Sequence, residues 1–337
     1  MTRHHVADDE FELSDPSRLP KKPVVSVFML AYNHGAYLAE AIEGVLKQET
    51  DFPIELLIGE DCSTDDTREI ALRYQRERPD VIRVITANSN IGGWKNYRRL
   101  LVASRGDFLA HHDGDDYWLP GKLQRQIALL RKNPDCVAVY TNALTVTEGG
   151  NLVGFFNDVG DQRIDLAAML RRGNFLNTSS MVFRAASRDS VLDIDGPFLD
   201  YRVHLRLARS GFLMQLAAPL TVYRINSRGS MVSRSNDLVR IFYWEAILDV
   251  PRDLVTDDDF AHGIADFLRR VAFRSLRMQR WALVREWIPL VFAASPYGTI
   301  KTMFLVIAAI FRSVWIEVIG KHRRGPDGRH VTVLYRR

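Results

Sequence analysis

The 337-residue sequence has little of three features that would place it in a special class of protein. Its two cysteines, Cys62 and Cys136, are too few for a disulfide scaffold or a four-thiolate zinc site, and they favour a reducing compartment. The first 22 residues contain no apolar core segment, so they are not a signal peptide. The longest uncharged run near the C-terminus, Thr302 to Phe311, has ten residues. A bilayer span needs about 20 residues.

Basic residues are spread unevenly along the chain, although the net charge is only +4. Residues 265–337 contain 14 Lys and Arg against 4 Asp and Glu, whereas the rest of the chain is slightly acidic. A basic C-terminal region on an acidic body predicts contact with an anionic surface. Apolar residues alternate with its arginines at helical spacing, which favours a membrane surface over nucleic acid. We therefore expect no nucleic-acid partner.

Short apolar runs alternate with helical patterns through the first 150 residues, as expected for an α/β fold with a mainly parallel sheet flanked by helices. In such sheets the ligand crevice lies at the carboxyl ends of the strands, and Asn33, Asp61, Asn90 and Asp113 all follow predicted strand ends. The predicted strands are Val24 to Leu30, Glu55 to Gly59, Val81 to Thr86, Phe108 to His111 and Val137 to Asn142. The predicted helices between them are Tyr37 to Gln48, Thr64 to Arg78, Asn96 to Ala103 and Lys122 to Lys132.

The pattern changes to helices without strands from Ile241 onward. We predict a mobile polar tail over residues 1–22, a catalytic domain over 23–235, and a basic amphipathic all-helical region over 236–337 that associates with a membrane. Phe260 to Arg280 offers apolar residues surrounded by arginines, which suits a membrane surface. For Thr302 to Ile319 we prefer a helix lying in the membrane interface, and a tilted span remains open.

Three carboxylates crowd into four residues at Asp113, Asp115 and Asp116, directly after an apolar run. Hard oxygen ligands at this spacing suit Mg²⁺ or Mn²⁺, especially when a substrate diphosphate supplies further oxygens. The alternative is a solvated Asp-Gly turn. The remaining motifs decide between these interpretations.

An ordered set of motifs strongly resembles glycosyltransferase family 2, from Val24 to about Ser233. The motifs are VSVFMLAYNHGAYL from Val25, GEDCSTDDT from Gly59, NIGG from Asn90 and HDGDDYW from His112. The resemblance implies the GT-A fold and inversion at the anomeric carbon of a nucleotide diphosphate sugar. It implies that Ala31, Tyr32 and Asn33 line the nucleotide and that Asp61 binds its base, which favours a pyrimidine and hence a UDP-sugar. It further implies that Lys95 and Asn96 lie beside the donor, with Lys95 where the family often has Arg.

By the same resemblance, Asp113 lies on the ribose side of the pair of aspartates and Asp115 on the metal side, with Asp116 close by. The cofactor is then Mg²⁺ or Mn²⁺, which neutralises the leaving diphosphate. Asp200 matches the general base, although Leu199 stands where the family often has Glu. A helix N-cap is the alternative role for Asp200. Further diphosphate or acceptor contacts are expected from Ser179, His204, Arg224, Asn226 and Arg228, with Asn226 in the place of a histidine that often reaches the metal.

We therefore expect a hexosyl- or N-acetylhexosaminyl-transferase that acts on a glycan or lipid-linked acceptor at the cytoplasmic face of the membrane. An oligomer remains possible. One alternative is a catalytically inactive nucleotide-sugar-binding or scaffold protein with the same fold, which the intact Asp61, Asp115 and Asp200 argue against. The other alternative is a sugar-nucleotide pyrophosphorylase, whose Gly-rich, Arg-containing start is missing after Leu30. No Ser-His-Asp or Cys-His arrangement indicates covalent catalysis.

Overall fold

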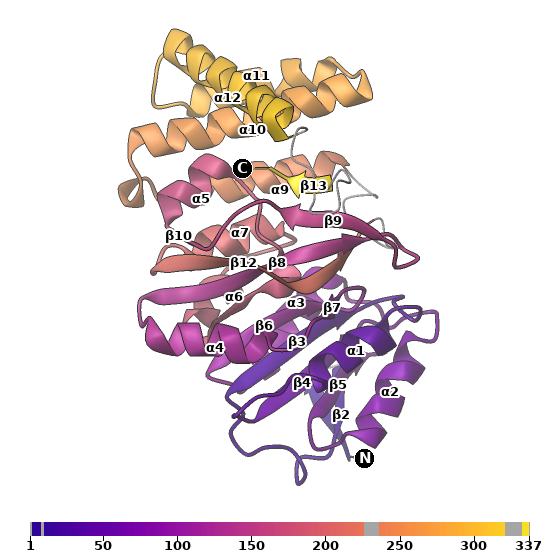
Figure 1. The fold of residues 1–337 in the computed structure, drawn as a ribbon. Coiled ribbons are helices and arrows are strands. Elements are labelled where there is room, and N and C mark those ends of the chain that lie inside the picture. Colours follow the sequence, from indigo (N-terminus) through magenta and orange to yellow (C-terminus); the bar gives the residue numbers. More distant parts are fainter. Residues whose placement is uncertain (1, 8–9, 226–235, 321–331, 337) are drawn as a thin grey trace.

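The computed structural model describes residues 2–7, 10–225, 236–320 and 332–336, and their strands form one mixed sheet (Figure 1). Its main path runs β1-β2-β5-β4-β3-β6-β11-β8-β12-β10, while β7 pairs with β12 and β9 joins β8 to β13. The strands are β1 Thr2–Ala7, β2 Glu10–Ser14, β3 Val25–Ala31, β4 Ile54–Glu60, β5 Ile82–Ala87, β6 Phe108–Asp113, β7 Tyr117–Trp118, β8 Cys136–Val146, β9 Leu152–Asn157, β10 Gln162–Ile164, β11 Val182–Arg184, β12 Phe212–Arg224 and β13 Thr332–Tyr335.

The centre of the sheet consists of the four parallel strands β5, β4, β3 and β6. These strands are almost continuously apolar because both of their faces are covered by helices. On one face lie α1 (Leu38–Leu46), α2 (Thr67–Glu77) and α4 (Lys122–Lys132), which bury their apolar stripes against the sheet. On the other face lies α3 (Gly93–Ala103). The predicted fold class is confirmed.

The N-terminal segment departs from the predicted mobile tail. Glu10–Ser14 form β2, which pairs antiparallel with β5 and extends the sheet at this edge. The Arg83 guanidinium on β5 joins the two strands, because its Nε and Nη2 atoms donate to the Glu12 carboxylate at 2.7 and 2.8 Å. The sequence pattern missed this strand because its charged residues, Glu10 and Glu12, leave no long apolar run.

Beyond β6 the sheet becomes mixed, since the short antiparallel strand β11 lies between β6 and β8. The segment from Asn177 to Arg184 contains a 3₁₀ turn at Thr178–Ser180 and the strand β11. Around it lie the helices α5 Leu166–Arg172, α6 Arg188–Leu192 and α7 Asp200–Leu207. The strand β13 near the C-terminus pairs with β9 and corrects the expectation of a strand-free C-terminal region.

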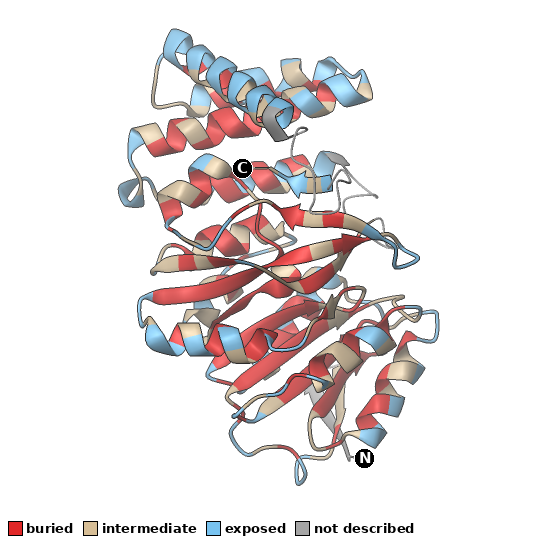
Figure 2. Ribbon diagram, viewed as in Figure 1, coloured by how far each residue is buried: buried red, intermediate tan, exposed pale blue. Residues whose placement is uncertain are grey.

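The C-terminal helices are α9 Asn236–Leu248, α10 Asp257–Met278, α11 Ala282–Ala294 and α12 Thr299–Gly320. They lie at the end of the molecule opposite the N-terminal strands (Figure 1). Phe267 and Val271 of α10 are 2% and 1% exposed and belong to the same core cluster as α3 and α7. The prediction that α10 offers an apolar surface to a membrane is therefore wrong for most of the helix, which packs inside the protein (Figure 2). Near its end, Phe273 and Leu276 are 37% and 56% exposed. The helix α12 is exposed along most of its described length.

Candidate active site

A cavity of about 950 Å³ runs from the carboxyl ends of β3 and β6 to the helices α9 and α10. Leu30 and Asp113 line it at the strand ends, and Asp200 lines it at the start of α7. Of the residues predicted from sequence, the cavity brings together Lys95, Asp113, Asp115, Ser179 and Asp200. The placement agrees with the rule that ligands of parallel sheets bind beyond the strand carboxyl ends.

A tight loop between β6 and β7 holds the acidic cluster. The Gly114 amide donates to Leu30 O at 2.8 Å, which ties the loop to the end of β3. A Cβ atom on Gly114 would lie 2.8 Å from Leu30 O and 2.9 Å from His34 Nδ1, which is too close for any other residue without a shift. The glycine between the aspartates therefore lets the loop pack closely on the sheet, and both flanking carboxylates still line the cavity.

The carboxylates of the cluster lie in different environments. Burial disfavours the charged form of Asp113, but His111, whose Nε2 lies 3.0 Å from Asp113 Oδ1, holds the pKa of Asp113 below its usual value. Burial, and after it the charges of Asp115 and Asp113, raise the pKa of Asp116 well above its usual value. Asp116 Oδ1 accepts a hydrogen bond from the Arg224 amide at 2.9 Å, and the residue does not line the cavity. Asp116 therefore supports the loop, whereas Asp113 and Asp115 face the ligand space.

A divalent metal fits this site only together with a substrate. Among the residues that the structure describes, no three His, Cys, Asp or Glu side chains gather closely enough to hold an ion alone. Mg²⁺ commonly takes one or two carboxylates and completes its shell with substrate phosphate oxygens and water. Asp115 and Asp113 could supply that protein share. The residues present fit a metal that arrives with a nucleotide diphosphate.

Arg224 belongs to the framework beneath the acidic loop and does not line the cavity. Its Nε donates to Asp115 O at 3.1 Å and its Nη1 to Glu148 O at 3.0 Å, while Nη2 pairs with Glu40 at 2.8 Å. The expectation that Arg224 grips a diphosphate is therefore corrected, since its guanidinium is committed to the protein. The predicted contacts Asn226 and Arg228 lie outside the described residues.

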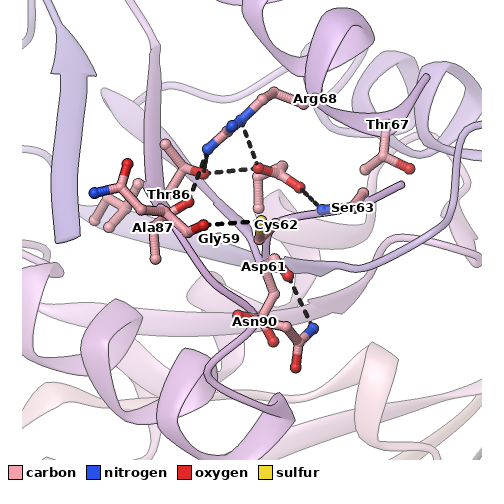
Figure 3. Close-up of polar contacts among 12 residues, drawn as sticks. Gly59, Asp61, Cys62, Ser63, Thr67, Arg68, Thr86, Ala87 and Asn90 are labelled. Carbon is pink, nitrogen blue, oxygen red and sulfur yellow. Dashed lines mark hydrogen bonds and ion pairs between the residues drawn. The ribbon is translucent and has the colours of Figure 1, made fainter. Parts of the chain in front are cut away.

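Asp61 shapes one wall of the cavity through its backbone contacts. Its two carboxylate oxygens accept the amides of Ile91 and Gly92 at 2.9 and 3.0 Å, and the side chain is buried. Asn90 Nδ2 also donates to Asp61 O at 2.9 Å (Figure 3). Asp61 itself does not line the cavity, but Ile91 and Gly92 do. A nucleobase N–H would have to share an oxygen that already accepts a backbone bond.

The neighbouring Glu60 is the centre of a second network at the same strand end (Figure 3). Its carboxylate accepts Ser63 N at 2.6 Å and Thr86 Oγ1 at 2.7 Å, and it pairs with Arg68 Nε at 3.0 Å. Arg68 also donates to Ala87 O at 2.9 Å. These bonds fix β4, β5 and the start of α2 relative to one another. The wall that Asp61 builds is therefore anchored on both sides.

The other predicted nucleotide contacts lie near the cavity but only one reaches it. Ala31, Tyr32 and Asn33 do not line it, although Leu30 and His34 on either side do. Asn33 has a left-handed φ of 56°, and its Oδ1 accepts Thr64 N at 2.8 Å, so it holds two loops together.

On α3, the exposed Lys95 faces the cavity, whereas the buried Asn96 turns toward the sheet and donates to Gly59 O at 2.7 Å. Asn33 and Asn96 thus make structural contacts, whereas the roles of Ala31 and Tyr32 in nucleotide binding stay predictions.

Asp200 is the first residue of α7, and its carboxylate is held on both oxygens. Oδ1 accepts Asn174 Nδ2 at 2.8 Å, and Oδ2 accepts Thr178 Oγ1 at 2.7 Å. The helix N-terminus adds a favourable partial positive charge for the anion. Leu199, and not Asp200, occupies the N-cap position of α7. The Asp200 carboxylate accepts only the amide of the next residue, Tyr201 N, at 2.8 Å among the helix amides. A carboxylate has about four lone-pair sites, so Asp200 keeps the capacity to accept a proton from a ligand.

The predictions that His204 and Ser179 contact the substrate have different outcomes. Burial lowers the pKa of His204 to about 4, and the ring lies behind Thr178, with Nε2 3.4 Å from Thr178 Oγ1. His204 does not line the cavity, so the expected acceptor contact is wrong. Ser179 does line it, and its hydroxyl oxygen accepts Asp113 N at 3.1 Å.

The sequence and the fold of this chain both resemble those of known proteins. Residues 26–179 match the family model described as Glycosyl transferase family 2. An uncharacterized glycosyltransferase of Nostoc sp. is 30% identical over 222 residues, which cover 63% of this chain and 68% of that protein. The chain belongs to glycosyltransferase family 2. The predicted family is confirmed.

Two further likenesses extend over more of this glycosyltransferase. An uncharacterized protein of Mycobacterium tuberculosis is 32% identical over 240 residues, 68% of each chain. The crystal structure of S. aureus TarS in complex with UDP-GlcNAc superposes with a TM-score of 0.62 at 16% identity, covering 89% of this chain and 93% of that one. At this identity the second likeness shows the fold alone.

The sequence reasoning missed several residues that the glycosyltransferase site uses. Asn174 and Thr178 hold Asp200, yet neither was predicted as a site residue from the sequence. Asn174 follows Gly173, which ends α5 with φ of 68°. A glycine followed by a polar residue at a helix end was the available signal. Residues of α9 and α10 line the far end of the cavity. They lie outside the region that matches the family model, and no sequence motif predicted them.

Proposed function

We propose that this glycosyltransferase moves a sugar from a nucleotide diphosphate sugar to a hydroxyl of a glycan or lipid-linked glycan, with inversion at the anomeric carbon. The carrying observation is that a single cavity is lined by the two aspartates of the acidic loop and by Asp200. Two separate carboxylate sites suit a displacement in which one site binds the leaving group and the other accepts the proton of the attacking hydroxyl on the opposite side. A hexosyl or N-acetylhexosaminyl group is the proposed cargo.

On this proposal, Asp200 is the general base. A sugar hydroxyl is a weak nucleophile at neutral pH, and a carboxylate that takes its proton as the new bond forms assists the attack. Asn174 and Thr178 orient the carboxylate by one bond to each oxygen. One displacement of the diphosphate by the activated hydroxyl gives inversion and needs no enzyme nucleophile.

The acidic loop is the proposed diphosphate end. Asp115 and Asp113 would hold Mg²⁺ or Mn²⁺ there, and the bound metal would neutralise charge on the leaving nucleoside diphosphate. Lys95, which lines the same cavity, offers a further point charge for phosphate oxygens. A uridine nucleotide is the proposed donor, and its support is that TarS, which shares the fold, is in complex with UDP-GlcNAc.

The direct test is a donor screen with the full chain. Released nucleotide is measured by mass spectrometry over a panel of UDP-, dTDP- and GDP-sugars in the presence of Mn²⁺, with wild type and Asp200→Asn. We expect release from UDP-sugars to fall by about 10²–10⁴-fold in Asp200→Asn, because a general base typically contributes that much, while UDP affinity stays within threefold. Turnover within about threefold of wild type would reject the base. A product of retained anomeric configuration by NMR would reject the single displacement.

We further propose that the enzyme works at the cytoplasmic face of a membrane, attached through α12. The helix segment Thr299–Val318 is long and apolar enough to cross a bilayer, with mean hydropathy 1.7, and only 11% of its apolar window is buried. Its outer face is apolar, and its pale blue colour marks it as exposed (Figure 2). The basic residues Lys321, Arg323 and Arg324 follow in the sequence. Anionic lipid headgroups attract such residues next to a membrane-bound helix.

A further inference from the structure

Two buried side chains in the wall of the cavity each have a polar atom without a hydrogen-bond partner. Tyr97 of α3 and Asn177, directly before the 3₁₀ turn, line the cavity and are 5% and 2% exposed. Neither Tyr97 Oη nor Asn177 Oδ1 has a hydrogen-bond partner among the described residues. A buried polar atom without a partner is unfavourable and rare in proteins. Both atoms therefore suit a partner that comes from outside the described chain.

The position of the Tyr97 hydroxyl is fixed by the packing of its ring. The ring meets Phe28 and Phe198 edge-on, with centroids 5.4 and 5.5 Å apart, and its centroid lies 5.4 Å from that of His111. The helix that carries Tyr97 is tied to the sheet, since the preceding residue, Asn96, donates to a carbonyl of β4 at 2.7 Å. A group that is already held in place loses little conformational entropy when it binds a ligand. The Tyr97 hydroxyl is therefore suited to bind one particular group.

The two side chains lie near both carboxylate sites of the cavity. The Tyr97 ring contacts His111, whose Nε2 lies 3.0 Å from Asp113 Oδ1. Burial, and after it the charges of Asp113 and Asp200, raise the pKa of Tyr97, so its hydroxyl stays protonated and able to donate. Asn177 lies on the side of Asp200, because the residue that follows it donates to the Asp200 carboxylate at 2.7 Å.

The transferred sugar is the part of the substrates that we expect in this space. In a single displacement the sugar lies between the leaving diphosphate and the attacking hydroxyl. The proposed function assigns the diphosphate to the acidic loop and the attacking hydroxyl to Asp200. A sugar ring carries several hydroxyl groups, and each hydroxyl can both donate and accept a hydrogen bond. Such a ring could therefore supply the partners that Tyr97 and Asn177 lack.

We propose that Tyr97 and Asn177 bind oxygen groups of the transferred sugar and thereby help to select the donor. This assignment rests on the proposed function, because it names the residues that bind part of that function's first substrate. Tyr97 Oη donates to a sugar oxygen, and Asn177 Oδ1 accepts from a sugar hydroxyl. A site built to bond a hydroxyl rejects an analogue that lacks it, because the buried polar groups of the site are then left unpaired.

Calorimetry with the full chain and Mn²⁺ tests the assignment, with UDP, UDP-glucose, UDP-galactose and UDP-GlcNAc as probes. The measured quantity is the Kd of the tightest-binding UDP-sugar divided by the Kd of UDP, which separates the sugar from the nucleotide. Tyr97→Phe removes only the hydroxyl, and Asn177→Ala removes the amide. We expect each variant to raise this ratio about three- to tenfold, because one hydrogen bond to the sugar is lost, and to leave UDP affinity unchanged.

Tyr74→Phe is the matched control. Tyr74 of α2 is 9% exposed, does not line the cavity, and donates to Glu43 Oε1 at 3.1 Å. The control should leave the ratio unchanged and lower the melting temperature, because a bond within the protein is lost. Tyr97→Phe should not lower the melting temperature of the ligand-free protein, because the hydroxyl bonds to no described residue. A purely structural Tyr97 would give the result of the control.

Each of the two residues is judged by its own variant. Its role is overturned if the ratio stays within about twofold of wild type, which is less than one hydrogen bond contributes. It is also overturned if UDP and the UDP-sugar weaken by the same factor. Failure of the wild-type protein to bind UDP, or to bind any of these UDP-sugars, would instead count against the proposed function.

Discussion

At the scale of single residues, neighbouring aspartates of this enzyme have two different roles, although they form one cluster in the sequence. Asp113 and Asp115 line the cavity, while Asp116 is buried and accepts the Arg224 amide. The loop also depends on Arg224, whose guanidinium donates to Asp115 O. The same residue type at adjacent positions therefore gives ligand contact in one case and loop support in the other.

Removing the metal or its proposed ligand should weaken donor binding. We expect EDTA or Asp115→Ala to reduce UDP affinity at least about tenfold, because the diphosphate charge is then left without a cation. Asp107→Ala, at an exposed carboxylate before β6, should leave the affinity unchanged. Isothermal calorimetry with Mn²⁺ measures each case. Equal affinity with and without EDTA would reject the metal. Asp116→Asn keeps the acceptor for the Arg224 amide and removes a charge that burial disfavours, so it should not lower the melting temperature.

The buried His204 should make stability depend on pH. Its pKa falls from the usual 6.5 to about 4 because of burial, so below pH 6.5 the unfolded chain takes up a proton that the folded chain does not. The folded state therefore loses stability as pH falls from 6.5 to 4, by on the order of 3 kcal/mol. Urea unfolding of wild type and His204→Gln across this range measures it. The destabilisation caused by the substitution should shrink as pH falls, and a constant difference would contradict the prediction.

At the scale of elements, one carboxylate fastens the helix that carries Asp200 to the C-terminal region. Asp249, directly after α9, pairs with Arg202, Arg206 and Arg209 of α7 and its end at 3.1, 2.6 and 2.5 Å. These arginines hold the pKa of Asp249 far below its usual value, although burial opposes them. The helical region is thus joined to the catalytic domain by charge as well as by apolar packing.

Asp249→Asn should destabilise the protein by about 3–5 kcal/mol, because it leaves several partly buried guanidinium groups without their anion. Asp253→Asn, the same change at an exposed position four residues later, should cost less than about 0.5 kcal/mol. Urea unfolding of both variants at pH 7 makes the comparison. A similar small loss in both would show that the cluster contributes little.

At the scale of the whole molecule, α12 is the part that the protein does not cover. Thr302 and Val306 pack against the protein, whereas Ile300, Phe304, Phe311 and Trp315 are 88%, 70%, 70% and 67% exposed. Their spacing places these four side chains along one face of the helix. A continuous apolar face of this kind marks an interaction surface. The helices α9 and α10 line one end of the cavity, and α12 packs against α10.

Full-length protein should co-sediment with phosphatidylglycerol liposomes at low salt. Replacing Phe304, Phe311 and Trp315 by Gln should abolish this binding, because the apolar area that would enter the lipid is removed. Leu152→Gln, at an exposed apolar residue of β9, serves as the matched control and should bind normally. Release of wild type by high salt indicates surface attachment, and retention in carbonate indicates insertion. Absence of the wild-type protein from the pellet at low salt would reject membrane docking.

The sequence by itself determined the central fold and the candidate chemistry. The alternation of β3 to β6 with α1 to α3 could be predicted because each helix or strand has a hydrophobic pattern within its own residues. Buried parallel strands are continuously apolar, which makes them recognisable. The acidic loop and Asp200 were found for a similar reason, since the motifs that carry them are contiguous in the chain.

Only the tertiary structure decided which polar residues face the cavity. Asp61, Asn96, His204 and Arg224 lie in or near the same motifs as true cavity residues, yet each is turned toward partners far away in sequence. The role of α10 was also decided by packing, because its apolar stripe fits either a membrane or a protein core. The structure buries that stripe and exposes α12 instead. A local sequence pattern shows that a helix has an apolar face but not what covers that face, and contacts between residues far apart in the sequence decide this.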